Sequence, residues 1–387
     1  MKTSRFFVRA ASFLTAAALL TAAAPLLPET AGTSVTAIAA DENYTDGSND
    51  QFMYRKFSDH IEIVFASANY DPDSLVIPDS IDGMPVTFIG IYAFQLCKMT
   101  SLTLPDTLTE IKPYAFGFCK NLKKLTMPDS LKKIGFHAFE SCDSLETIEF
   151  PDHLVETGDF TFDETPWLAA QRKNNPLVIV NNAVIDGRTC EGEVKIPSGV
   201  KYIASGAFSK NEKITSVVVP ASITAIQDNT FWQCSNLTSA EIKGAESLGW
   251  GAFGYCDKLT DLKLSGKLKK IDDDAFVDND ASATITFYGS ESTWNQVTKP
   301  QNDGYLQRAR MVFDENHTDE PDEPDGPVIG DINKDGACTV ADAVLLQKWL
   351  LAIPNTELPD WKAGDMNGDE QLDARDLTIL KTVLLAG

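Results

Sequence analysis

A repeat of about 23 residues fills the middle of the chain and constrains its fold more than any other feature. A Phe preceded by Ala or Thr recurs at spacings of 22, 23, 23, 46, 23, 22 and 23 residues, and 46 is two periods. A unit this short cannot bury its apolar face alone, so successive units must stack and cover one another. The repeat therefore predicts a solenoid. Its marker residues are Phe94, Phe116, Phe139, Phe162, Phe208, Phe231, Phe253 and Phe276.

A second marker keeps the same period. Short segments of alternating apolar and polar residues, such as Leu125-Thr126-Met127, recur between the Phe positions. This alternation is typical of a strand with one buried face, and each unit adds one strand beside the previous one. The sequence therefore predicts a ladder of nine parallel strands spaced about 4.8 Å apart. The strands begin at Leu75, Leu102, Leu125, Ile148, Val194, Val217, Ala240, Leu262 and Ile285.

The combined unit, I-x-x-x-A-F-x-x-C-x-x-L-x-x-L-x-L-P, resembles the BspA-like leucine-rich repeat of bacterial surface and secreted proteins over about residues 52–290. The resemblance implies recognition of a protein or surface, without a fixed ligand. We expect an N-terminal cap with the first strand over residues 41–88, and repeats ending in a C-terminal cap over residues 89–313. An insert at residues 166–202 replaces one repeat, and its segment PLVIVNNAVIDG predicts a hairpin turned at Asn181-Asn182.

The seven cysteines could form disulfides in an oxidising compartment. Five of them stand three residues after a repeat Phe, and this fixed phase marks an internal position where Cys serves as a small apolar residue. We therefore predict buried, unpaired thiols, and leave the pairing of Cys190 and Cys338 open. The five are Cys97, Cys119, Cys142, Cys234 and Cys256.

Two surfaces of the repeats could bind a ligand. The outward strand positions are rich in Ser and Thr, carry mixed charge and include no aromatic residue. The other surface is a column two residues before each Phe, aromatic in the first four copies at Tyr92, Tyr114, His137 and Phe160. These rings could form a binding stripe, but we favour packing between successive coils, because large surface aromatics usually cover core.

The net charge and the absence of catalytic motifs exclude several classes of function. The chain has 33 Lys and Arg against 56 Asp and Glu, a net charge of −23, which argues against nucleic acid and anionic membranes as partners. None of the four histidines accompanies a nucleophile or metalloprotease pattern, so we predict no catalytic residue and no enzyme. Two alternatives stay open: an enzyme whose chemistry hides in the insert at 166–202, and a structural adhesin or spacer. The histidines are His60, His137, His153 and His317.

The first 40 residues have the pattern of a signal peptide. A basic start with Lys2, Arg5 and Arg9 precedes the apolar run ASFLTAAALLTAAA, and small residues favour cleavage after Ala39 or Ala40. The alternative is a retained anchor, but the run is shorter than the ~20 residues that span a bilayer. The sequence therefore predicts a secreted protein whose mature chain has no membrane span.

The C-terminal part begins with an acidic, Pro-rich linker over residues 314–329, followed by two near-copies 34 residues apart, DINKDGACTVAD and DMNGDEQLDARD. Each copy has oxygen donors at positions 1, 3, 5, 7, 9 and 12 of a 12-residue loop, which is the pattern that calcium requires. We therefore predict two calcium ions. Their ligands are Asp331, Asn333, Asp335, the Ala337 carbonyl, Thr339 and Asp342 in the first loop, and Asp365, Asn367, Asp369, the Gln371 carbonyl, Asp373 and Asp376 in the second.

Each loop runs directly into one apolar helix, and this duplication over residues 330–387 resembles a type I dockerin. The resemblance implies attachment to the cohesin module of a scaffoldin in a cellulosome, and contacts at loop positions 10 and 11 and in the following helix. These positions are Val340, Ala341, Gln347 and Lys348 in the first copy, and Ala374, Arg375, Lys381 and Thr382 in the second.

The two copies differ at these contact positions, so we expect one docking orientation to prevail. The charge of Arg375 and Lys381 favours the second copy. The whole sequence thus predicts an α+β protein: a leucine-rich-repeat solenoid carried on a small all-α, calcium-binding dockerin. Its function would be non-catalytic recognition, outside the cell, within a complex of polysaccharide catabolism.

Overall fold

The computed structural model describes most of the chain after residue 43. It covers residues 44–317, apart from 68–69, 152, 154 and 301–302. In the C-terminal part it covers residues 330, 332–333, 338, 340–354, 356–359, 361–366 and 371–386. The predicted signal peptide, at residues 1–40, and the part of the predicted linker at residues 318–329 lie outside the described residues. In the described part, no helix has both the length and the apolar character that crossing a membrane requires.

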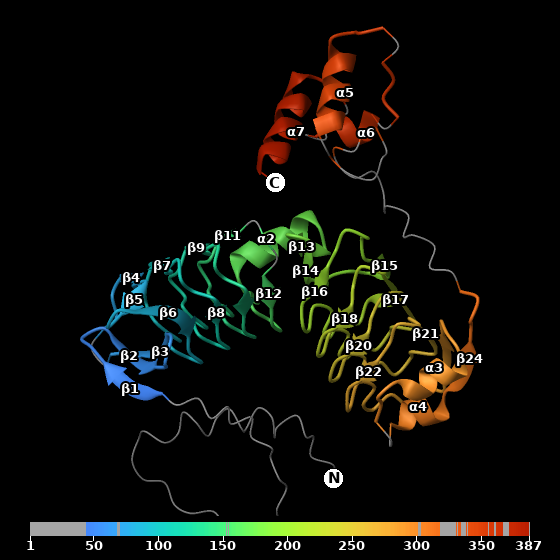
Figure 1. Cartoon of the computed structure of the whole chain (residues 1–387), viewed down its shortest axis with the longest axis horizontal. Coiled ribbons are helices and arrows are strands. Elements are labelled where there is room, and N and C mark those ends of the chain that lie inside the picture. Colours follow the sequence, from blue (N-terminus) through green and yellow to red (C-terminus); the bar gives the residue numbers. More distant parts are fainter. Residues whose placement is uncertain are drawn as a thin grey trace, which may run out of the picture. The chain divides into compact units, whose positions relative to one another are not determined.

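The repeats form stacked coils, and each coil contributes one strand to a parallel ladder (Figure 1). All nine predicted strands are present, and the structure adds a tenth at the C-terminal end. Hydrogen bonds join them in three runs instead of one continuous ladder: β4–β7, β9–β11, and β15 through β24. The strands are β4 (Ser74–Val76), β7 (Ser101–Thr103), β9 (Lys124–Thr126), β11 (Thr147–Glu149), β15 (Gly192–Lys195), β17 (Ile214–Val219), β19 (Ser239–Ile242), β21 (Asp261–Leu264), β23 (Thr284–Phe287) and β24 (Arg310–Phe313).

A second parallel ladder, which the sequence analysis did not predict, runs through the same coils. Its rungs are two residues long. The inward residue stands five residues before the repeat Phe, as Ile111 does before Phe116, and is apolar in every rung except β12, where it is Thr157. Two parallel ladders give each coil two hydrogen-bonded sides. The rungs are β8 (Glu110–Ile111), β10 (Lys133–Ile134), β12 (Glu156–Thr157), β16 (Tyr202–Ile203), β18 (Ala225–Ile226), β20 (Ser247–Leu248) and β22 (Lys270–Ile271).

Both ends of the repeats are closed by structure of a different kind. At the N-terminal end, three antiparallel strands lead into the second ladder through β6, which pairs in parallel with β3 and β8. At the C-terminal end, two short helices precede β24 and bring Trp294 and Tyr305 into the core. The capping elements are β1 (Thr45–Ser48), β2 (Phe52–Lys56), β3 (Ile61–Ala66), β5 (Ser80–Ile81), β6 (Met84–Ile89), α3 (Glu291–Gln296) and α4 (Gly304–Arg308).

The insert contains a helix and the predicted hairpin. Thr165 caps α2 (Pro166–Asn174) by accepting a hydrogen bond from the amide of Leu168. Strands β13 (Val178–Val180) and β14 (Ala183–Asp186) pair antiparallel, and Asn181 and Asn182 have φ angles of 47° and 60°. Two left-handed residues are typical of the tight turn that joins such strands, and Asn tolerates them well. β14 then pairs with β16, so the insert supplies a rung of the second ladder.

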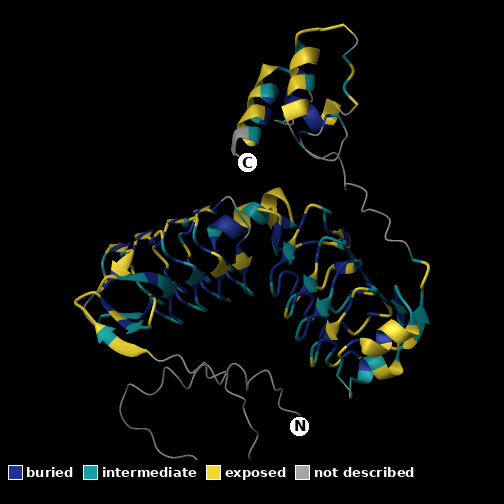
Figure 2. Cartoon of the chain, viewed as in Figure 1, coloured by how far each residue is buried: buried dark blue, intermediate teal, exposed yellow. Residues whose placement is uncertain are grey.

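Stacked Phe rings form the centre of the core, which is buried throughout (Figure 2). Neighbouring rings lie nearly parallel, with centroids 5.1 to 5.9 Å apart, in one stack from Phe94 to Phe162 and another from Phe208 to Phe276. The stacks do not join across the insert. Trp167 packs on Phe162 instead, and a Cβ added at Gly187 would overlap the Phe208 ring. The repeats therefore contain two apolar cores, one on each side of the insert.

The repeat cysteines lie inside these cores. Four of the five are fully buried, as predicted, whereas Cys97 in the first copy is only half-buried because no earlier repeat covers it. Each buried thiol donates to the carbonyl of the Phe one coil earlier, at 3.1 to 3.3 Å, as Cys119 does to Phe94. Burial raises the pKa of Cys234 to about 12, and that of Cys190 in the insert to about 11. None of the seven cysteines, all of which lie in the described part of the chain, forms a disulfide in the structure.

These thiols should be unreactive in the folded protein and reactive after unfolding. At pH 8 the raised pKa values leave little thiolate, and burial excludes the reagent. Ellman's reagent should therefore detect few thiols in native protein, and at least five in protein denatured without reductant. Two or fewer after denaturation would show that disulfides join the coils.

Candidate calcium and partner-binding site

The C-terminal module is three helices around a small apolar core. Its helices are α5 (Val340–Leu350), α6 (Trp361–Gly364) and α7 (Ala374–Ala386), and α5 packs on α7. Ile332, Leu346 and Leu380 are fully buried between them. Such a core is small for 58 residues, so other interactions must contribute to the stability of the module.

Each helix begins with a buried carboxylate at loop position 12. Asp342 on α5 and Asp376 on α7 have no exposed surface. In the first loop, the amides of Ile332 and Asn333 donate to Oδ1 of Asp342 at 2.8 and 2.9 Å. In the second loop, the amide of Met366 donates to Oδ1 of Asp376 at 2.9 Å. Both loops are thus closed in the same way, from the position-12 carboxylate back to the second residue of the loop.

The start of α7 shows why Asp suits these positions. Asp373 precedes the helix and accepts from the amide of Arg375 at 2.6 Å, while Oδ2 of Asp376 accepts from the amide of Asp373 at 2.8 Å. The amides of a first helical turn have no partner within the helix, and acidic side chains in that turn also interact favourably with the helix dipole. The same residues therefore cap the helix and bring carboxylates to the loop.

Among the described residues, no group of three or more His, Cys, Asp or Glu side chains is placed to hold a metal, so the fit to calcium rests on the chemistry of the loops. Buried carboxylates are costly unless charge or hydrogen bonds compensate them, and Asp342 and Asp376 bring such carboxylates to the two loops. Calcium prefers oxygen ligands, which these side chains provide. Six predicted ligands are described: Asn333, Asp342, Asp365, Gln371, Asp373 and Asp376. The other six, Asp331, Asp335, Ala337, Thr339, Asn367 and Asp369, lie outside the described residues.

The predicted docking residues all lie on the exposed surface of α5 and α7 (Figure 2). Nζ of Lys381 donates to Oε1 of Gln347 at 3.2 Å, so the two copies meet at equivalent positions. Nε of Arg375 lies 3.9 Å from Oδ2 of Asp373. The predicted docking residues of both copies therefore lie on two helices that pack on each other.

The outward strand face of the repeats carries mainly polar side chains. In β7, β9 and β11 the middle residue is buried and its neighbours are exposed, as the alternation predicted. Neighbouring rungs contact one another: Oγ of Ser101 donates to Oγ of Ser74 at 2.8 Å, and Nζ of Lys124 lies 2.7 Å from Oε1 of Glu149. Many of these groups remain exposed and available to a ligand.

The aromatic column is a packed stack. Tyr92, Tyr114, His137 and Phe160 are half-buried, and successive rings lie 4.8 to 5.2 Å apart within 19° of parallel. All eight residues of the column have φ between 53° and 62°, including Gly206, Asn229, Gly251 and Asp274 in the later copies. Bulky residues rarely adopt such angles. The packing interpretation is supported, since successive rings are stacked face to face and partly buried.

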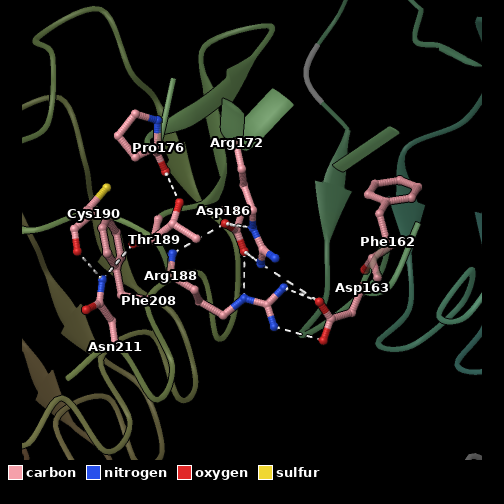
Figure 3. A network of polar contacts seen from close by, with 12 residues as sticks. Phe162, Asp163, Arg172, Pro176, Asp186, Arg188, Thr189, Cys190, Phe208 and Asn211 are labelled. Atoms are coloured by element: carbon pink, nitrogen blue, oxygen red, sulfur yellow. Dashed lines mark hydrogen bonds and ion pairs between the residues drawn. The ribbon is translucent and has the colours of Figure 1, made fainter. Parts of the chain in front are cut away.

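A buried ion network joins the insert to the coil before it, and the sequence analysis missed it (Figure 3). Arg172 on α2 donates two hydrogen bonds to Asp186 at 2.8 and 2.9 Å. Arg188 donates to Asp186 at 2.6 Å, and two further bonds to Asp163 at 2.8 and 3.1 Å. Asp186 is 1% exposed. The network thus bridges the two apolar cores at the place where the Phe stack is interrupted.

The described part of the insert contains ion pairs instead of a nucleophile beside a base. Two acids, Asp163 just before the insert and the buried Asp186 within it, are bound by guanidinium groups. Elsewhere, Nε2 of His153 lies 2.8 Å from the carbonyl of Leu131, and Nδ1 of His137 lies 3.0 Å from Glu140. These contacts hold coils together, and they offer no observation in favour of chemistry in the insert.

Asp159, next to the network, should make stability depend on pH. Burial raises the pKa of Asp159 to about 6, although Asn229 donates to its Oδ2 at 3.1 Å. Because the folded state holds this proton more tightly than the unfolded state, stability should fall as the pH rises from about 4 to 6. Asp159→Asn should therefore be more stable than the wild type at pH 8 and equal to it at pH 4, by urea unfolding. An equal difference at both pH values would contradict this.

Together, the two ladders and the paired acidic loops define a class: a repeat solenoid joined to a calcium-loop helical module. The BspA type leucine rich repeat region matches in six copies over residues 87–187 and 179–296, more than half of the chain, and the dockerin type I domain matches residues 329–385. The chain belongs to the BspA-type leucine-rich-repeat family and carries a C-terminal type I dockerin. Type I dockerins bind calcium.

Solved structures of bacterial leucine-rich-repeat proteins are similar to the chain. The leucine-rich-repeat protein of T. pallidum is 27% identical, with 56% of this chain and 91% of that one covered and a TM-score of 0.33. A leucine-rich cell surface protein of Faecalibacterium prausnitzii is 18% identical, with 68% and 100% covered and a TM-score of 0.32. No curated protein sequence matches significantly.

Proposed function

We propose that the chain is a secreted, non-catalytic recognition protein of a cellulosome. Its dockerin binds two calcium ions and, through them, the cohesin module of a scaffoldin. Its repeats bind a protein or surface ligand and bring it to the complex. The observation that carries the proposal is the pair of loops closed on the buried carboxylates of Asp342 and Asp376.

Calcium controls the proposed attachment because the loops and the docking helices are continuous. Asp342 and Asp376 are the third residues of α5 and α7, and the predicted docking residues lie on both sides of them on the same helices. Ions held at the loops would fix the starts of both helices and their shared surface. Small metal-binding domains gain much of their folding free energy in this way.

A binding experiment with the full mature chain tests the attachment. Immobilised type I cohesin modules should capture the chain in millimolar calcium and release it in EDTA. The double variant Asp342→Ala, Asp376→Ala should not be captured, whereas Lys124→Ala on the repeats should behave like the wild type. Capture that persists in EDTA would overturn the calcium dependence.

The repeats offer a broad surface for recognition, which their family membership and their exposed strand face support. A glycan array and a pull-down with the full chain would identify the class of ligand. A specific bound protein or glycan supports recognition. Turnover of a polysaccharide would favour the enzyme alternative, and no ligand in either assay would favour a spacer.

Export is proposed from the signal-peptide pattern of residues 1–40. The exported chain should begin after Ala39 or Ala40 and lie outside the cell, free or attached at the surface. N-terminal sequencing of secreted protein tests this, and a mature protein that keeps Lys2 would show a retained segment.

A further inference from the structure

We propose that the cohesin docks on this dockerin in one orientation, centred on an apolar stripe of α5. The stripe consists of Val340, Val344 and Leu351, which follows the last residue of α5. This inference rests on the proposed function and specifies which copy the partner covers. It departs from the expectation based on charge, which favoured the second copy.

The stripe lies on one side of the helix and faces away from the core. Its members are four and seven residues apart, spacings that bring side chains to the same helix face. They are 67, 43 and 65% exposed. The core-facing residues of the same helix, such as Ala343 and Leu346, are buried. The stripe is therefore apolar surface that the dockerin itself leaves in water.

The second copy lacks this surface. The residues equivalent to Val340 and Val344 are Ala374 and Thr378, both exposed, and Oγ1 of Thr378 donates to the Ala374 carbonyl at 2.7 Å. The neighbouring Arg375 side chain is 76% exposed. Leu351 corresponds to Leu385 in the sequence, so the difference between the copies lies in the first two positions.

The hydrogen bond between Gln347 and Lys381 joins the exposed faces of α5 and α7 into one surface. Its α5 half is apolar, and its α7 half is polar and charged. Gln347 and Lys381 are equivalent residues, so a rotation that exchanges the copies would map this contact onto itself. A partner rotated in this way would meet Ala374, Thr378 and Arg375 in place of the stripe. Its apolar surface would then desolvate a charged side chain and leave Val340 and Val344 in water, which is unfavourable.

Exposed charges contribute little to such a surface. Lys381 is already bound to Gln347, and Arg375 lies near Asp373 in the loop. Surface ion pairs gain little because water and salt screen them, whereas interface free energy concentrates in a few well-covered side chains. The geometry thus points to the apolar half as the centre of docking and to the charged half as its rim.

Matched double substitutions in the full mature chain test the orientation. Val340→Asp, Val344→Asp should weaken binding more than a hundredfold to a type I cohesin that captures the wild type in calcium. Ala374→Asp, Thr378→Asp adds the same charge at equivalent positions, on the rim of the proposed surface, and should weaken binding at least tenfold less than the first variant. Val340→Ala, Val344→Ala, which cannot disturb the core, should weaken binding about tenfold. Calcium-dependent circular dichroism verifies that each variant keeps its helices.

The possible outcomes distinguish a failure of the single orientation from a failure of the proposed cohesin binding. Equal losses in the two Asp variants, or a larger loss on α7, would overturn the single orientation while the attachment itself stands. A wild-type chain that binds no cohesin in calcium would overturn the attachment, and the orientation with it.

Discussion

Removing calcium with EDTA is expected to abolish most of the helical signal of the dockerin and to leave the repeats folded. The dockerin has only five fully or nearly fully buried apolar residues among those described, Ile332, Ala343, Leu346, Ala363 and Leu380. Without the ions, the buried carboxylates of Asp342 and Asp376 lose the proposed compensating charge, so helix formation and metal binding should be coupled. Circular dichroism at 222 nm measures the loss, and returning calcium should restore the signal.

The repeats provide the internal control for this experiment, since they contain no predicted calcium ligand. Their strand signal and melting temperature should be the same with and without EDTA. A matched substitution pair adds a second control: Asp376→Ala should weaken calcium binding, whereas Asp314→Ala, outside the loops, should not. A helical signal that EDTA leaves unchanged would contradict the loop assignment.

Asp186→Ala should destabilise the repeats by about 3–5 kcal/mol, the usual cost of breaking a buried ion pair. The substitution removes the carboxylate that both Arg172 and Arg188 bind, and leaves their charges partly buried. For a domain of this size, each kcal/mol lowers the melting temperature by about 2–4 °C, so a decrease on the order of 10 °C is expected.

An exposed ion pair serves as the control for that measurement. Lys213 and Glu191 have side chains that are 63 and 68% exposed, so Lys213→Ala should cost less than about 1 kcal/mol. Thermal unfolding of both variants in EDTA isolates the repeats from the dockerin. If the Asp186→Ala variant has the same melting temperature as the Lys213→Ala variant, the network does not hold the two cores together.

The features that the sequence predicted well are those encoded by neighbouring residues. Strand alternation, the hairpin at Asn181-Asn182 and the Cys phase each appear within a few positions, so a periodic pattern reveals them. The second ladder was missed although its apolar residue stands in the repeat motif, because two-residue strands are too short to show alternation. The break in the first ladder was missed as well, since it depends on how the insert replaces a coil.

The features that the sequence did not predict depend on contacts between distant residues. Asp163, Arg172 and Asp186 have no common spacing, so only the folded coils bring them together. The left-handed angles of Tyr92 and Phe160 run against residue preference, and stacking with neighbouring coils sustains them. The apolar stripe on α5 needed measured exposure, because Val340 and Leu346 are equally hydrophobic and only one of them faces water.

The interrupted Phe stack has a mechanical consequence for a tethered protein. If the dockerin is fixed to a scaffold and the repeats hold a ligand, tension enters the repeats at β24 and passes through the rungs in order. Each coil contacts mainly its neighbours, so the load is borne rung by rung. Because the apolar residues of the repeats divide into two cores, one on each side of the insert, the C-terminal core can give way under tension while the N-terminal core keeps its fold. Unfolding under tension would then stop at the insert, between the half of the repeats next to the anchor and the half farther from it.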